Sequence, residues 1–147
     1  MLIEERFVLF HVSAQTQQEA IEQVIKKASE QHRVSLIKEV VTAVMQREQE
    51  SSTGFGKGIA IPHGKSAFVL EPTLLFARLT DAIEWNAMDG APVDTLFMIL
   101  VPESNHTTHL QILAKLARKL MHTEFVNQLA TLQTPAEVTT FIRQELA

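Results

Sequence analysis

The chain has 147 residues, of which 46% are apolar and 20% charged, with a formal net charge of −4. This length and balance are typical of one globular domain with a sizeable core. The slightly acidic balance, without a basic stripe, argues against binding to nucleic acid. The absence of cysteine excludes disulfides, thiolate chemistry and cysteine–zinc sites. No signal peptide is recognisable and no apolar run reaches the roughly 20 residues that cross a bilayer, so we expect a cytoplasmic protein.

The first third of the chain predicts a strand and two helices. The apolar run 7–12 predicts a strand. Thr16 and Glu19 have the spacing of a capping box, in which each side chain bonds the other's backbone N–H, and apolar residues follow at helical spacing. A second helix is predicted from about Ser35 to residues 47–48. Its expected buried stripe consists of Leu36, Ile37, Val40, Val41 and Val44.

The middle of the chain predicts a block of strands. The extended segments are residues 59–61, 68–70, 73–79 and 93–101. The last two are apolar and long enough to be central strands. Asp89-Gly90 predicts a turn between them, and Trp85 is expected to anchor that connection.

The last third of the chain predicts helices. One apolar stripe consists of Leu110, Leu113, Leu116, Ala117 and Leu120. Thr123 is expected to cap a short helix, and residues 134–137 (Thr-Pro-Ala-Glu) predict the start of another. Because helices precede and follow the strands, we expect residues 1–147 to form a single α/β (α+β) domain with a mixed β-sheet flanked by helices.

A glycine-rich segment leads to the most informative histidine. Gly54, Gly56 and Gly58 alternate with other residues, a short apolar stretch follows, and His63 comes directly after Pro62. Glycines let the backbone approach a ligand and offer main-chain N–H donors, and a histidine held there is a candidate nucleophile or general base. The alternative is that the glycines make turns and His63 is a loop histidine.

Two further histidines and an arginine are candidates for a phosphoryl site. His109 lies in the first turn of a predicted helix, where free N–H groups favour anions, although it also heads an apolar stripe. His106 is expected just before that helix and could donate to a phosphate in the same way, although its polar, proline-containing neighbourhood favours a loop residue. Arg47 closes the second helix, and its guanidinium matches a phosphate, although a solvated helix end is the simpler interpretation. The remaining histidines, His11, His32 and His122, are expected to be structural or exposed.

Three competing chemistries fit the sequence less well. A phosphate-binding P-loop would require a glycine spacing that the segment from Gly58 misses by one residue, with Pro62 inside the cradle. A zinc site from His63, His106 and His109 would lack cysteine and an obvious carboxylate partner. A serine hydrolase would require a Gly-x-Ser-x-Gly elbow, which is absent from the sequence.

Three segments carry a resemblance to a known family. Residues 47–65 (REQESSTGFGKGIAIPHGK), 89–93 (DGAPV) and 109–117 (HLQILAKLA) resemble the enzyme IIA domains of the fructose–mannitol class (type 2). These domains belong to the bacterial phosphoenolpyruvate-dependent sugar phosphotransferase system (PTS). The resemblance extends over nearly the whole chain.

The resemblance implies a phosphocarrier that works without metal or cofactor. It implies that His63 accepts a phosphoryl group from the phosphocarrier HPr and passes it to a cysteine of a IIB domain, which serves a membrane IIC component. Arg47 and His109 fall on the family's other active-site positions. We expect one ring nitrogen of His63 to be unprotonated and the other to bond a backbone carbonyl.

The surroundings of the phosphoryl group are a further expectation. Backbone N–H groups of Gly54, Gly56 and Gly58 are expected to help hold it, with Thr53 beside them and Phe55 on an apolar rim. Phe55 and Lys57 depart from the family's usual small residues at these positions.

Several alternatives remain open at this stage. The chain is also similar to nitrogen-related regulatory IIA proteins, which control other proteins through the same phosphorylated histidine. A signalling module from a larger regulator and a binding protein that is not phosphorylated are further alternatives. The sugar and the oligomeric state cannot be read from the sequence.

Overall fold

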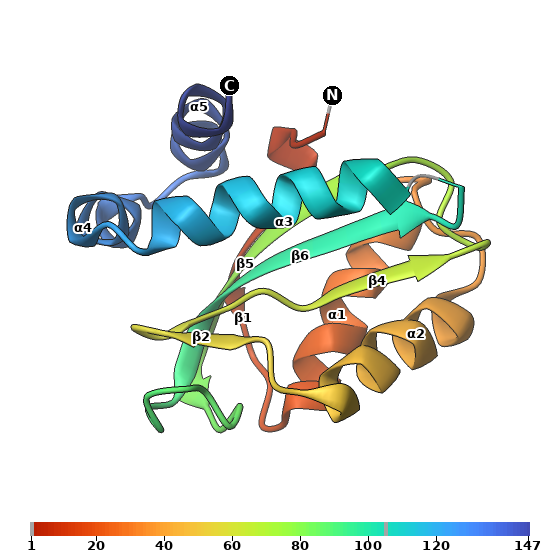
Figure 1. Cartoon of the computed structure of the whole chain (residues 1–147), viewed down its shortest axis with the longest axis horizontal. Helices are drawn as coiled ribbons and strands as arrows, with labels where there is room; N and C mark the ends of the chain where they lie inside the picture. Colours follow the sequence, from red (N-terminus) through yellow and green to blue (C-terminus); the bar gives the residue numbers. More distant parts are fainter. Residues whose placement is uncertain (1, 105) are drawn as a thin grey trace.

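The computed structural model describes residues 2–104 and 106–147, with only the backbone of residues 106 and 108. Figure 1 shows one sheet with helices on both sides. The elements run in the order η1 (Glu5–Phe7), β1 (Val8–Val12), α1 (Gln17–Glu30), α2 (Ile37–Glu50), β2 (Gly54–Gly56), β3 (Ile59–Ala60), β4 (His63–Ser66), β5 (Thr73–Ile83), β6 (Val93–Pro102), α3 (His106–Leu120), α4 (Thr123–Thr131) and α5 (Pro135–Leu146).

The sheet is mixed, as predicted. Its order is β1-β5-β6-β3-β2, and β4 also pairs with β6. Strands β5 and β6 are antiparallel, whereas β1 is parallel to β5. Strands β3 and β4 both run parallel to β6 and follow one another along the same edge of it. Strand β2 is antiparallel to β3.

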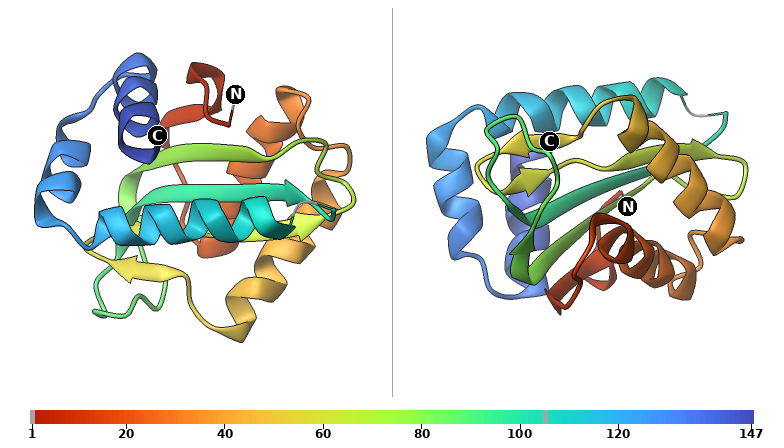
Figure 2. Two further views of the ribbon diagram at one scale, coloured as in Figure 1. Left: turned by 45° about the horizontal axis from the view of Figure 1, so that its top comes forward. Right: turned by 90° about the horizontal axis from the view of Figure 1, so that it is seen from below.

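The two central strands have helices on both faces, as the further views in Figure 2 show. Leu75, Leu96 and Met98 belong to a core shared with α1 and α2. Phe76 and Phe97, on the opposite pleat, belong to a core shared with α3, α4 and α5. Because both faces are buried, β5 and β6 read as nearly continuous apolar runs, and the prediction of two central strands is confirmed.

The block of edge strands differs from the prediction. Residues 68–70 are not a strand: Val69 forms only an isolated bridge with Val34, after a turn. The strand predicted to stop at Pro62 resumes as β4, which the sequence analysis missed. The reason is that β4 (His63-Gly64-Lys65-Ser66) lacks apolar alternation and owes its strand geometry to its pairing with β6.

Three apolar residues predicted to be buried are exposed. Leu36 is 50% exposed because it precedes the first turn of α2 as its N-cap. Ile37 is 39% exposed and lines a groove of about 490 Å³ between α1 and α2. Leu110 is 51% exposed because Ile112 and Leu116 define the buried stripe of α3, and Leu110 lies more than half a turn from Ile112.

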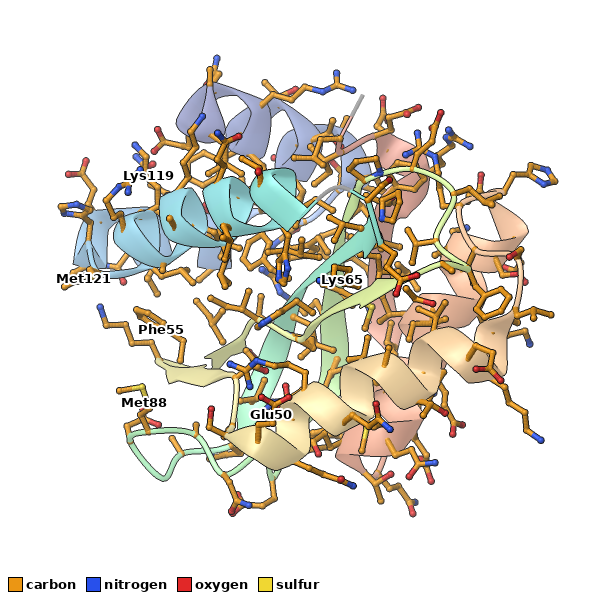
Figure 3. The ribbon with its side chains drawn as sticks, turned by 45° about the vertical axis from the view of Figure 1, so that its right-hand side comes forward. Glu50, Phe55, Lys65, Met88, Lys119 and Met121 are labelled. Atoms are coloured by element: carbon orange, nitrogen blue, oxygen red, sulfur yellow. The ribbon has the colours of Figure 1, made fainter. Side chains whose placement is uncertain are left out.

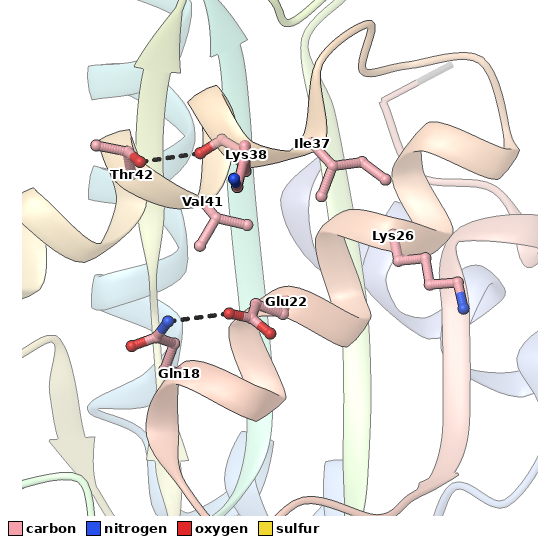
Figure 4. Close-up of a pocket in the computed structure, with 7 residues that line it drawn as sticks. All are labelled: Gln18, Glu22, Lys26, Ile37, Lys38, Val41 and Thr42. Carbon is pink, nitrogen blue, oxygen red and sulfur yellow. Dashed lines mark hydrogen bonds between the residues drawn. The ribbon is translucent and has the colours of Figure 1, made fainter.

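The groove between α1 and α2 is shown in Figure 4. Its walls carry Glu22 and Lys26 from α1 and Lys38 and Val41 from α2. None of the predicted site residues is among those that line it.

The helix caps are partly as predicted. The Thr16 hydroxyl accepts a hydrogen bond from the Glu19 N–H, but the Glu19 carboxylate accepts from the Gln15 N–H, so the predicted reciprocal box is only half formed. Thr134 caps α5 in a complete capping box with Glu137. The N-cap of α4 is His122, and Thr123 is the first helical residue, which corrects that prediction.

The described helices give no indication of a membrane span. Among them, none is both long and apolar enough to cross a bilayer.

Candidate functional site

The candidate site lies where the edge of the sheet is interrupted. Strand β3 ends at Ala60, and Pro62, which has no N–H to donate, separates it from β4. The Pro62 carbonyl accepts a hydrogen bond of 3.1 Å from the Ile99 N–H of β6, so the chain stays beside β6 across the interruption. His63 is the first residue of β4 and pairs with Ile99.

Strand alternation fixes the direction of the His63 side chain. A Cβ atom built on Gly64 would lie 2.8 Å from the Cγ2 atom of Val44, so that side of β4 packs directly against α2. Successive residues of a strand point to opposite faces. His63 therefore projects toward the α3 side of the sheet, where it is only 5% exposed.

The two ring nitrogens of His63 have different environments. Nδ1 lies 2.8 Å from the carbonyl oxygen of Ile61. A carbonyl can only accept, so Nδ1 carries the proton in this contact and Nε2 keeps its lone pair. The expectation that a backbone carbonyl orients the ring is confirmed.

The electrostatics favour a neutral His63 ring. Burial lowers the pKa of His63, and the positive charge of Arg47 lowers it further. The hydrogen bond to Ile61 and the carboxylates of Glu48 and Glu50 act in the opposite direction without reversing the shift. A neutral ring with a free Nε2 is the form that can attack phosphorus.

The structure brings His109 to His63. His109 lies in the first turn of α3, and the two ring centroids are 4.8 Å apart with the planes tilted by 55°. His109 is half-buried. A histidine in the first turn of a helix lies where N–H groups and the helix dipole favour a negative charge. The prediction that His106 precedes this helix is wrong, since α3 begins at His106, whose side chain lies outside the described residues.

Arg47 lies in the last turn of α2 and acts on the same region. Its Nη1 donates a hydrogen bond of 2.8 Å to the carbonyl oxygen of Ser51, just beyond the helix. Its positive charge lowers the pKa of His63. Figure 3 shows this side of the molecule, with Lys65 on β4 between α3 and α2 and Glu50 at the end of α2.

A buried carboxylate, which the sequence analysis missed, holds the segment between α2 and β2. Glu48 is 8% exposed and accepts hydrogen bonds from the Thr53 N–H (3.1 Å), from the Thr53 hydroxyl and from the Gln17 side chain. The Trp85 indole N–H donates to the same hydroxyl, at 3.4 Å. The sequence does indicate the burial of Glu48, because this residue continues the buried stripe of Val40 and Val44 at a spacing of four residues.

The glycine segment forms a hairpin of β2 and β3. A Cβ on Gly54 would lie 2.7 Å from the Cα of Ala87, so the backbones meet closely there. Gly56 and Gly58 have φ values of +115° and +79°, which the turn requires.

One of the three glycine N–H groups expected to hold the phosphoryl group is already engaged in the hairpin. The Gly54 N–H donates to the Ser52 hydroxyl, and the neighbouring Thr53 and Lys57 N–H groups donate to the carboxylates of Glu48 and Asp89. The role of the Gly56 and Gly58 N–H groups stays a prediction.

Side chains of the hairpin reach toward α3. Phe55 is half-buried and packs against the core on the α3 side. The Lys57 ammonium donates to the carbonyl oxygen of Leu120, 3.3 Å away at the end of α3. This contact suits the negative end of a helix dipole.

The other histidines lie where the sequence analysis expects them. His11, His32 and His122 are exposed. Within the described part of the chain, there is no group of three or more histidine, aspartate or glutamate side chains that could hold a metal ion.

Comparison with known proteins identifies the family. Residues 1–145 match the family described as "Phosphoenolpyruvate-dependent sugar phosphotransferase system, EIIA 2". The chain belongs to this family. EIIA domains are components of a phosphotransferase system, which supports a general role of this chain in phosphoryl transfer.

Curated relatives of two kinds are similar to the chain. A fructose-specific EIIA component of Haloferax volcanii is 45% identical over 107 residues, which is 73% of this chain and 70% of that protein. A fructose-like EIIA component of Escherichia coli is 46% identical over 86 residues, which is 58% of each chain. A nitrogen regulatory protein of Escherichia coli is 37% identical over 129 residues, covering 86% of this chain and 78% of that protein.

Solved structures share the fold of this EIIA domain. The nitrogen regulatory protein IIA-Ntr from Neisseria meningitidis aligns over 99% of this chain and 97% of its own, with a TM-score of 0.86 and 29% identity. Enzyme IIA of the mannitol system of Escherichia coli, solved in complex with phosphorylated IIB, aligns over 95% of each chain, with a TM-score of 0.77 and 20% identity. The second likeness concerns the fold alone.

Proposed function

We propose that this EIIA domain is a phosphocarrier that takes a phosphoryl group from phospho-HPr on Nε2 of His63. In this step the bond between phosphorus and the donor histidine of HPr breaks, and its electron pair returns to that nitrogen. A new bond forms between phosphorus and Nε2, using the lone pair of His63. No metal is required, because the donor is a phosphohistidine and not a nucleotide.

The observation that carries the proposal is the contact between His63 Nδ1 and the Ile61 carbonyl, at 2.8 Å. It leaves Nε2 as the nucleophile and holds the ring in one orientation. The lowered pKa of His63 keeps this nitrogen unprotonated near neutral pH.

Arg47 and His109 are proposed to stabilise the transferred group. Phosphoryl transfer passes through a loose transition state with charge on the phosphoryl oxygens, so positioning and electrostatics supply most of the catalysis. The guanidinium of Arg47 and the ring of His109 are hydrogen-bond donors that suit those oxygens. Thr53, Phe55, Gly54, Gly56 and Gly58 are proposed as the rim beside them.

The second half of the cycle returns the phosphoryl group to a partner. A cysteine thiolate of a IIB domain attacks phosphorus, the bond to Nε2 breaks and His63 regains its lone pair. The IIB domain then serves a IIC component in the membrane. The fructose-specific relative supports this transport role.

A regulatory role is the second candidate. The nitrogen regulatory protein of Escherichia coli aligns over 86% of the chain, against 73% for the fructose-specific relative. In that role His63 carries the same phosphoryl group, and its phosphorylation state controls another protein.

Transfer from radiolabelled phosphoenolpyruvate through enzyme I and HPr tests the proposal. The protein is expected to take up acid-labile label, and the His63→Ala variant is expected to take up none. Labelling of His63→Ala at the same site would overturn the assignment. Onward transfer from the labelled protein to IIB domains encoded beside its gene separates transport from regulation.

A further inference from the structure

One lysine shares the strand and the face of His63. Lys65 is two residues further along β4, so both side chains leave the strand on the same side. Their Cα atoms are about 6.6 Å apart on an extended strand. Gly64 between them faces α2, where Val44 leaves no room for a side chain. Lys65 is therefore directed to the α3 side of the sheet, beside the nucleophile.

Lys65 is exposed and has no fixed partner. Among the described residues, no hydrogen bond or ion pair involves its ammonium group. The two nearby cations differ in this respect, because Arg47 is bonded to Ser51 and Lys57 to Leu120. Figure 3 shows Lys65 on β4, between α3 and α2.

A phosphoryl group brings negative charge to a place where carboxylates already act. From α2, the carboxylates of Glu48 and Glu50 raise the pKa of His63, whereas the positive charge of Arg47 lowers it. From α3, the ring of His109 lies beside that of His63. A phosphoryl group adds about two negative charges at this place. A further cation beside the bound group would offset part of this charge.

We infer that Lys65 is a mobile cation that swings onto the phosphoryl group of phosphorylated His63 and stabilises this form of the protein. The inference rests on the proposed function, because it requires phosphorylation of His63. The flexible stem of a lysine allows this movement, whereas the ammonium stays in water in the unphosphorylated protein. Lys65 thereby sets how readily the domain gives up its phosphoryl group.

The test compares phosphorylated forms of the whole protein, first without a protein partner and then in exchange with HPr. The unmodified protein, Lys65→Gln, Lys65→Arg and Lys38→Gln are phosphorylated with phosphoramidate and titrated by ³¹P NMR. Lys38 is the matched control, since it is an exposed lysine in the groove between α1 and α2.

Without the Lys65 ammonium, the doubly charged form of the phosphoryl group is less stable, so the group is expected to give up its proton less readily. Lys65→Gln is expected to lower its acid dissociation constant by roughly 1.5- to 5-fold, the range of an exposed ion pair. It is also expected to shift the transfer equilibrium toward phospho-HPr. Lys65→Arg is expected to restore both values, and Lys38→Gln to leave them unchanged.

An identical ³¹P titration for Lys65→Gln and the unmodified protein overturns the inference. If exchange with HPr is slower in that variant while the titration is unchanged, Lys65 is a docking residue instead. Absence of any phosphohistidine signal at His63 in the unmodified protein is a different result and contradicts the proposed function itself.

Discussion

The Nδ1 atom of His63 lies 2.8 Å from the carbonyl oxygen of Ile61, two residues earlier in the chain. This local contact fixes the tautomer of a histidine that is 5% exposed. Residues distant in the chain also act on the ring, since His109 of α3 packs against it and the charge of Arg47 on α2 lowers its pKa.

The lowered pKa of His63 predicts the pH dependence of phosphoryl uptake. The neutral ring is the nucleophile, so uptake is expected to persist below pH 6.5, the ordinary pKa of histidine, and to fall only as the pH passes the lower pKa of the folded protein. Initial rates of transfer from phospho-HPr between pH 5 and 8, with the donor kept saturating, measure how uptake falls with decreasing pH. A rate that already falls by half at pH 6.5 or above contradicts the prediction.

The same shift predicts a contribution to stability. The unfolded chain binds a proton at His63 more readily than the folded chain does. Stability from this group is therefore complete above the unfolded pKa of about 6.5 and declines as the pH falls from there to the folded pKa. Urea denaturation of the protein and of His63→Gln at pH 5 and pH 7.5 is expected to show a smaller pH dependence in the variant.

Removal of the Arg47 guanidinium is expected to slow transfer and to change His63. Arg47→Gln loses a charged hydrogen-bond donor, an effect of about 1.5–3 kcal/mol that corresponds to a rate lower by roughly 10- to 100-fold. It also raises the pKa of His63, because the positive charge of Arg47 lowers it. NMR titration of the His63 ring detects this change independently of the transfer rate. An unchanged rate and pKa would show that Arg47 does not act on the site.

The buried carboxylate of Glu48 predicts a structural effect near the site. Glu48→Ala leaves the Thr53 N–H and hydroxyl without their acceptor, which is expected to lower the free energy of unfolding by about 1–3 kcal/mol. Glu50→Ala is the matched control, since Glu50 is exposed on the same turn of α2. Chemical denaturation of both variants measures the difference, and equal stabilities would contradict the role of Glu48.

The contact between Gly64 and α2 predicts a coupled pair of substitutions. Gly64→Ala places a methyl group 2.8 Å from Val44 Cγ2, and such overpacking typically costs about 1–3 kcal/mol. Val44→Ala in the same protein removes that methyl group and is expected to recover part of the loss, although the Val44 backbone nitrogen at 3.3 Å remains close. A double-mutant cycle with purely additive effects contradicts the contact.

The parts of the fold that follow from residue pattern were predictable. The apolar runs that became β5 and β6 need burial on both faces, and Thr134 with Glu137 caps α5 through purely local bonds. Strand β4 was not predictable in this way, because its four residues carry no apolar pattern and their conformation comes from pairing with β6.

In the candidate site too, features set by local sequence were predictable, whereas those set by packing were not. His63 could be singled out because the glycines and Pro62 around it act locally. Its approach to His109 depends on the packing of α3 over the sheet, so residue spacing alone could not predict it, and only the family resemblance pointed to the pair. The Gly54 N–H was expected to hold the phosphoryl group, but it bonds to the Ser52 hydroxyl. The Lys57 N–H bonds to Asp89, which is too far along the chain for residue pattern to have indicated it.

The central claim is that Nε2 of His63 carries the phosphoryl group. NMR of the protein labelled with ¹⁵N at histidine, phosphorylated through phosphoenolpyruvate, enzyme I and HPr, identifies the modified nitrogen directly from its coupling to phosphorus. We predict the coupling at Nε2 of His63, with Nδ1 still protonated by its contact with Ile61. A phosphoryl group on Nδ1 of His63, or on any other residue, would contradict the account.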